Sequence, residues 1–298
     1  MLNLVNPSKV SRMKSTLNKT FAIISIAAFC FGCGSEQNPT AEVPKKAEAV
    51  DTPEISEEDL AEADKMISQM PSPIEMAILV KHAGGDYNSA LLNDVKRIDD
   101  YLTTGKKTLN MGVYSADVGY TSLYKQTQET VFYLNNVRKL SDAIGLTDAF
   151  DQTVFDRVES NIENRDSLLH ILSGAYDVAN EYLKQNNRMN TSLLMIAGGW
   201  IESMYLASNL GADGGRPEDI IALRIVEQDV VLDKILAAME LIKDDPLVDE
   251  FKAKLVELDQ FLDAKDIKIG EGEQATVDRE KVNLVFEKID EIRAWAVA

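Results

Sequence analysis

The sequence is poor in cysteine, histidine, glycine and proline, and each shortage argues against a class of protein. Its 298 residues include 2 Cys, 2 His, 16 Gly and 8 Pro. Both cysteines, Cys30 and Cys33, lie near the N-terminus, so the rest of the chain can form neither disulfides nor cysteine-ligated zinc sites. So little histidine leaves almost no material for a nucleophilic triad. The low glycine and proline content argues against low-complexity or turn-rich β structure.

Positive charge is also scarce. The chain has 31 basic and 49 acidic residues, a net charge of −18. Residues 1–32 carry four of the basic residues and no acid, so the remainder has a net charge of −22. Such a surface repels phosphate backbones, which excludes nucleic acid as a partner. The charge favours solubility, and binding of polycations or metal ions is the alternative.

Motifs that carry chemistry are missing too. The sequence contains no Glu-x-x-His, His-Glu-x-x-His or Gly-x-Ser-x-Gly motif, no phosphate-binding glycine loop and no EF-hand. We therefore predict no catalytic residue, no cofactor and no metal site from motifs.

The first 32 residues have the features of a secretory signal. Lys14 and Lys19 precede an eleven-residue apolar run over 21–31, which is the order of a positive n-region and an h-region. A membrane-spanning helix needs about 20 apolar residues, so this run is too short to span a bilayer. No other segment approaches that length without charge, and we predict no transmembrane helix. A start at Met13 would give a more typical signal length.

The apolar run ends in Cys30-Phe31-Gly32-Cys33, which resembles the lipobox of bacterial lipoproteins. The resemblance implies that Cys33 is lipidated and anchors the chain in the membrane. Gly34 in place of Asp implies the outer membrane, facing the periplasm or the surface. The family has Leu and a small residue where this chain has Cys30 and Phe31. Cleavage without lipidation, giving a soluble periplasmic protein, is therefore the alternative.

A tether and one domain follow the signal. Residues 33–55 hold prolines, alanines and charges without apolar periodicity, which is typical of a disordered linker. Ser56, followed by three acids, is a favourable helix start. We therefore expect a helical domain over 56–298.

Helical spacing of apolar residues recurs through this domain, as in Leu168, Leu172, Ala175 and Ala179. One short β-type segment, 267–269, is too brief to predict a sheet. The sequence therefore predicts an all-α fold, a multi-helix bundle or an array of helix hairpins. A weak similarity between the segments around 107–150 and 190–251 indicates an internal duplication, with chance similarity as the alternative. The expected helices are 56–69, 72–82, 88–103, 107–125, 126–144, 150–160, 162–185, 190–209, 217–243, 247–265 and 277–296.

Two of the expected helices carry almost no charge. Residues 108–124 contain only Asp117 as a charged side chain, and residues 189–212 contain only Glu202. A helix that is apolar on most sides is buried by its neighbours, so we expect both helices to be central.

Two interpretations of these acids stay open. Buried carboxyl groups have raised pKa values and can act as general acid or base. Together with nearby aromatic side chains they could also line a ligand pocket. In the alternative, each acid is tied to an arginine or a tyrosine hydroxyl and only fixes helix packing. The candidate pocket residues are Asp117, Glu202, Tyr114, Tyr120, Tyr124, Trp200 and Tyr205. The candidate arginines are Arg138, Arg165 and Arg188.

The glycine-rich loop 211–219 contains Arg216, which could bind an anion at a helix N-terminus. A plain turn, with Pro217 at the first helical position, is the alternative.

The layout as a whole resembles the all-helical lipoproteins of Gram-negative envelopes, a resemblance that implies no activity. Our first hypothesis is a non-enzymatic interaction or scaffold module with an unknown protein partner. A small-ligand-binding protein is the second, and an enzyme using the two buried acids is the third.

Overall fold

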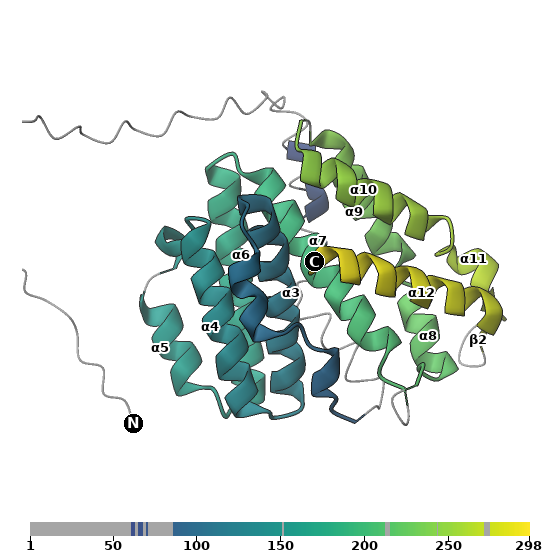
Figure 1. Cartoon of the computed structure of the whole chain (residues 1–298), viewed down its shortest axis with the longest axis horizontal. Helices are drawn as coiled ribbons and strands as arrows, with labels where there is room; N and C mark the ends of the chain where they lie inside the picture. Colours follow the sequence, from purple (N-terminus) through teal and green to yellow (C-terminus); the bar gives the residue numbers. More distant parts are fainter. Residues whose placement is uncertain are drawn as a thin grey trace, which may run out of the picture. The chain divides into compact units, whose positions relative to one another are not determined.

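A computed structural model describes residues 61–62, 65–67, 70, 86–150, 152–211, 215–242, 244–270 and 275–298. The predicted signal, Cys33, the tether and the predicted helix 72–82 lie outside these residues. The described part contains ten α-helices, three short 3-10 helices and one two-stranded sheet, which confirms the all-α prediction (Figure 1). None of the helices in this part is both long enough and apolar enough to cross a bilayer.

The elements from residue 89 to residue 208 include the two charge-poor helices, α3 and α7. In chain order they are η1 (Ser89–Leu91), η2 (Val95–Asp100), α3 (Thr104–Leu123), α4 (Thr127–Ala143), η3 (Thr147–Ala149), α5 (Gln152–Ser160), α6 (Arg165–Gln185) and α7 (Met189–Ser208).

The remaining elements pack mainly around α7 and α12. They are α8 (Asp219–Val226), α9 (Asp229–Leu241), α10 (Pro246–Asp259), α11 (Ala264–Ile267), β1 (Lys268–Ile269), β2 (Thr276–Val277) and α12 (Arg279–Ala296). β1 and β2 are antiparallel, with Lys268 opposite Val277.

Helix ends follow local chemistry. The Asp245 carboxylate accepts hydrogen bonds from the Leu247 and Val248 amides, and Pro246 occupies the first turn of α10. This satisfies amides that have no partner within the helix. After α4, Gly145 has φ of 71°, the left-handed conformation that commonly ends a helix.

Three predicted helices were wrong in extent. The predicted helix 247–265 ends at Asp259, and the separate helix α11 begins at Ala264. Residues 88–103 form no α-helix but two short 3-10 helices, because Asn88 and Asp94 accept hydrogen bonds from the amides two residues on. The predicted helix 217–243 is interrupted after Val226, begins at Asp219 rather than Pro217 and ends at Leu241.

The helices α3 and α7 are in close contact at two glycines. A Cβ added to Gly112 would lie 2.0 Å from the Met195 carbonyl oxygen, and one added to Gly198 would lie 2.2 Å from the Leu109 carbonyl oxygen. A Cβ added to Gly105 would lie 3.8 Å from Leu194, and further along Asp117 lies beside Glu202, so the two helices run in the same direction.

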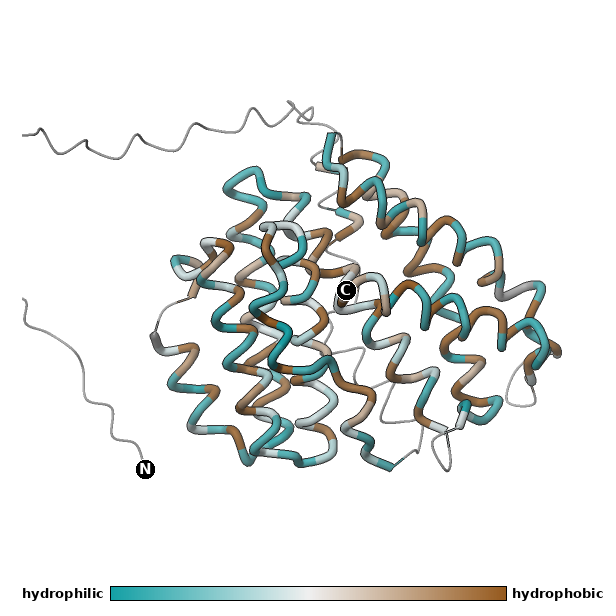
Figure 2. Tube along the Cα trace, in the orientation of Figure 1, coloured by the Kyte–Doolittle hydropathy of each residue, from teal (hydrophilic) through white to brown (hydrophobic). Residues whose placement is uncertain are grey.

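The buried apolar residues form one large core and one small cluster. The large core surrounds α3 and α7. The small cluster joins Val158 of α5 to Leu168 and Ile171 of α6. Figure 2 shows apolar and hydrophilic residues alternating along the helices, and Figure 1 shows α5 at the edge of the bundle.

Candidate functional site

The structure brings the two predicted acids together. Asp117 projects from α3 and Glu202 from α7, and both side chains are fully buried. The Glu202 carboxyl group lies close enough to Asp117 for its negative charge to raise the Asp117 pKa. Because α3 and α7 are parallel and in close contact, residues far apart in the sequence form a single acidic pair.

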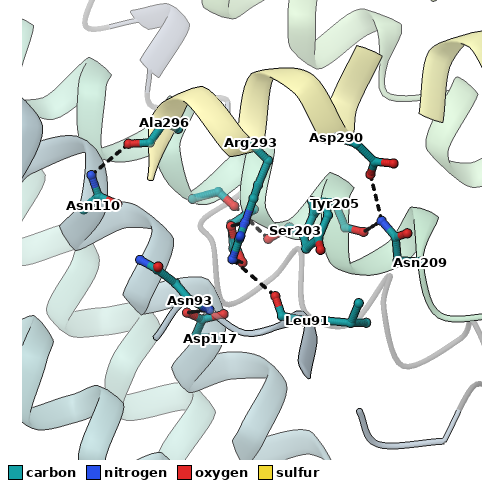
Figure 3. Close-up of polar contacts among 12 residues, drawn as sticks. Leu91, Asn93, Asn110, Asp117, Ser203, Tyr205, Asn209, Asp290, Arg293 and Ala296 are labelled. Atoms are coloured by element: carbon teal, nitrogen blue, oxygen red, sulfur yellow. Dashed lines mark hydrogen bonds and ion pairs between the residues drawn. The ribbon is translucent and has the colours of Figure 1, made fainter. Parts of the chain in front are cut away.

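An arginine from the C-terminal helix neutralises this pair. The Arg293 guanidinium donates from Nε to Glu202 Oε2 over 2.9 Å and from Nη2 to Glu202 Oε1 over 3.0 Å. Such a two-pronged pair is stronger and more directional than a single contact. Nη2 also donates to the Leu91 carbonyl oxygen over 3.2 Å (Figure 3).

None of the three arginines named from the sequence contacts the acids. Arg138 lies over the Phe155 ring, 4.6 Å from its centre. Arg165 pairs with its neighbour Asp166, and Arg188 donates to the Ile144 carbonyl oxygen. The partner is Arg293.

The proton of the pair belongs to Asp117. Burial raises the pKa of Asp117 well above its usual range, the Glu202 charge raises it further, and Arg293 opposes both. Burial alone would lower the Arg293 pKa, but Glu202 outweighs it and raises that pKa. A neutral Asp117 beside the Glu202–Arg293 ion pair leaves no net charge in the core.

A strap that contains no α-helix (residues 86–101) covers the pair. The Asn93 amide donates to Asp117 Oδ2 over 3.3 Å (Figure 3). The Asn93 carbonyl accepts from the Tyr133 hydroxyl over 3.1 Å, and its side-chain amide donates to Tyr101 over 2.9 Å. Tyr114 donates to the Asp94 carbonyl over 2.9 Å.

Side chains of α3, α4 and α12 therefore take the place of the backbone hydrogen bonds that a helix would have made over the strap. The segment packs against the core with only two short 3-10 helices, because its buried polar groups are satisfied in this way.

Two predicted pocket tyrosines, Tyr120 and Tyr124, form a ring cluster with Tyr87 at one end of this site. The Tyr120 hydroxyl accepts from the Asn88 amide over 2.8 Å, and burial raises the Tyr120 pKa to about 12. Its ring lies 5.3 Å from Tyr87 and 4.9 Å from Tyr124, measured between ring centres. Tyr87 in turn donates to Glu129. These contacts fix the start of the strap.

The other predicted residues separate into different environments. Tyr205 lies under the Arg293 guanidinium, 4.6 Å from ring centre to carbon, so it joins the acid site. Trp200 is buried in the core, at 2% exposure. Arg216 pairs with Asp290 over 2.8 Å and donates to Asn209, so its charge is already neutralised.

Sequence reasoning missed Arg293 and Asn93. Arg293 follows the buried Ile289 by four residues and precedes the buried Ala296 by three, so it lies on the apolar face of its helix. A positively charged residue on the apolar face of an amphipathic helix is the signal that could have identified Arg293 from the sequence. Asn93 carried no such signal, because its role depends on the strap.

The described residues also contain an apolar groove, away from the acid pair, between α4, α5 and α6. It has a volume of about 230 Å³ and lies where the small α5 cluster meets the large core. A second cavity of about 70 Å³ continues from it toward α3. The residues that line both are Leu134, Val137, Phe150, Leu172 and Ala175.

Four polar side chains line the groove: Asn135, Arg138, Ser141 and Glu159. Ser141 is 2% exposed, and its hydroxyl has no hydrogen-bond partner among the described residues. An unsatisfied buried hydroxyl costs free energy, roughly 1–3 kcal/mol. It therefore marks a place where a bound polar atom would be stabilising.

Comparison with protein-family models, with curated protein sequences and with solved structures gave no match. Within the part of the chain that the structure describes, no three His, Cys, Asp or Glu side chains are grouped so as to hold a metal ion.

Proposed function

We propose that the chain is an envelope protein anchored through lipidated Cys33, whose helical domain is a non-enzymatic binding module. The observation that supports a non-enzymatic role best is the internal pairing of Asp117, Glu202 and Arg293. General acid–base catalysis needs a group that can reach a substrate proton. These acids are fully buried, and Glu202 uses both oxygens on Arg293. The triad is better suited to fixing α3, α7 and α12 to one another.

The anchor is tested by expressing the full chain in a Gram-negative host with an alkyne-labelled fatty acid. We expect the protein to take up the label and to enter the detergent phase on partition. Cys33→Ala should abolish both, and Cys30→Ala, the matched control, should abolish neither. An unlabelled wild-type protein that stays in the aqueous phase would overturn the anchor.

The non-enzymatic role is tested in cells that depend on the protein, once a deletion phenotype is found. Asp117→Asn removes the ionisable group but keeps the shape and hydrogen bonds of a neutral Asp117. We expect this variant to complement the deletion fully. Loss of complementation by a variant that accumulates normally and is as stable as wild type would point to acid–base chemistry at Asp117.

A second candidate function, small-ligand binding, is favoured by the groove between α4, α5 and α6 rather than by the acid pair. Ligand sites are concave, mostly apolar and supplied with a few polar groups, with volumes of about 300–1,000 Å³. The groove and its continuation, at about 230 and about 70 Å³, reach the lower end of this range. Apart from four polar side chains, the lining of the larger groove is apolar, and the continuation adds only Ser115 and the tyrosine Tyr176 as polar groups.

A further inference from the structure

We propose that the groove between α4, α5 and α6 binds a single-chain amphiphile with a carboxylate head group, held by Arg138 and Ser141. The proposal rests on the second candidate function above and names its ligand. It does not depend on the anchor at Cys33.

The head-group contacts come from one face of α4. Arg138 and Ser141 are three residues apart, so their side chains project from the same side of the helix. The Ser141 hydroxyl is buried and has no partner. Arg138 is exposed, contacts the Phe155 ring and forms no ion pair with any other described residue. A carboxylate can accept a hydrogen bond from a hydroxyl and from a guanidinium at once.

The carboxylate supplies what both groups lack. It gives the hydroxyl an acceptor and the guanidinium a counter-charge. A hydroxyl or ammonium head group could satisfy Ser141 but could not pair with Arg138.

The rest of the groove suits a hydrocarbon chain. From Ser141 back to Val131 the groove follows ten residues of α4, about 15 Å at the rise of an α-helix. Val154, Val158 and Ile162 line the opposite wall. The smaller cavity extends the apolar space toward α3, where its lining includes Val118.

The one carboxylate on the rim lies away from the head-group position. Glu159 is one turn beyond Phe155 on α5, in the direction of Ile162. Phe155 faces Arg138, and Phe150 follows shortly after the C-terminal end of α4, the end that carries Ser141. The ligand's head group therefore lies at the end of the groove near Ser141, and its hydrocarbon chain extends toward the end near Glu159.

The test measures binding of dodecanoate, below its micelle concentration, to the purified protein by isothermal titration calorimetry. Dodecanol and dodecyltrimethylammonium provide the same chain with a neutral and a cationic head group. We expect dodecanoate to bind about tenfold more tightly than dodecanol, the usual gain from a charge-assisted hydrogen bond. The cationic compound should bind most weakly.

Variants assign the binding to the groove. Arg138→Gln should remove the preference for dodecanoate over dodecanol, whereas Lys139→Gln, the neighbouring exposed cation outside the lining, should leave it intact. Ser141→Ala should weaken dodecanoate binding about fivefold. The same substitution should leave thermal stability unchanged or higher, because it removes an unsatisfied buried hydroxyl. A purely structural serine would lower stability and leave affinity unchanged.

A third variant is designed to block the space for the ligand's hydrocarbon chain. Ala175→Leu places a larger side chain where the two cavities meet. It should abolish binding of all three compounds while the melting temperature stays within a few degrees of wild type.

Absence of dodecanoate binding, or binding that is unchanged in both Arg138→Gln and Ala175→Leu, would overturn the proposal. Tighter binding of a 12-carbon lysophosphatidylglycerol than of dodecanoate would overturn the carboxylate head group. Each of these results would leave the labelling experiment on Cys33 unaffected, so failure of the ligand and failure of the anchored role are distinguishable.

Discussion

The acid pair makes a quantitative prediction about non-additive substitutions. Glu202 and Arg293 form a buried two-pronged ion pair, and Asp117 lies beside Glu202 as a neutral acid. Removing one partner of a buried ion pair usually costs about 3–5 kcal/mol, because the other charge stays buried. Here a second acid is at hand. In Glu202→Gln, Asp117 loses the negative neighbour that helps to raise its pKa, and Arg293 still lowers that pKa.

Asp117 should therefore ionise in Glu202→Gln and replace Glu202 as the counter-charge. We expect this variant to lose only about 2 kcal/mol, below the usual cost of a broken buried pair. Asp117→Asn keeps the shape and hydrogen bonds of the neutral acid and should lose less than about 1 kcal/mol. The double variant leaves Arg293 without any acid, so it should lose about 4–5 kcal/mol. The loss in the double variant thus exceeds the sum of the two single losses by about 1–2 kcal/mol, and this difference is the coupling energy between Asp117 and Glu202.

The measurement is equilibrium urea unfolding of the four proteins at pH 7, followed by circular dichroism. Leu284→Ala, on the half-exposed side of α12, serves as a control for general sensitivity of this helix. Strictly additive losses, or a cost of Glu202→Gln equal to that of the double variant, would refute the view that Asp117 is a neutral reserve acid.

Three further predictions concern pH, close packing and the strap. The pKa of Asp117 is raised in the folded protein, so the folded state binds this proton more tightly than the unfolded state does. The free energy of unfolding should therefore fall as pH rises from about 4 toward the folded pKa, by about 1.4 kcal/mol per pH unit. Urea unfolding at pH 5 and 7 should show this slope in wild type and not in Asp117→Asn. Gly112→Ala should lower the free energy of unfolding by about 3 kcal/mol or more through overpacking. Gly174→Ala, whose added methyl group meets no atom within 4 Å, should instead stabilise the helix by up to about 1 kcal/mol. Both effects are measured as changes in melting temperature. Tyr133→Phe should cost about 1–3 kcal/mol, because the buried Asn93 carbonyl loses its donor, and should speed hydrogen exchange of amides in the strap.

The sequence by itself determined the helices and the inner position of two of them. Apolar spacing at the helical period depends only on local order along the chain, so α6, α7 and α12 could be predicted within a few residues. The charge-poor helices α3 and α7 proved to be central, because a helix without a polar face must be covered on most sides. The burial of their single acids followed from the same argument.

Tertiary structure decided what those acids contact. Arg293 lies 91 residues after Glu202, and only the packing of α12 against α7 brings them together. The strap could not be predicted, because its carbonyl and amide groups are satisfied by side chains from other helices instead of by a local helical pattern. The groove likewise exists only because α5 stands off from α4. A hydrophobic pattern tells which side chains leave water, but which buried polar groups meet, and where packing leaves space, depends on contacts between segments far apart in the chain.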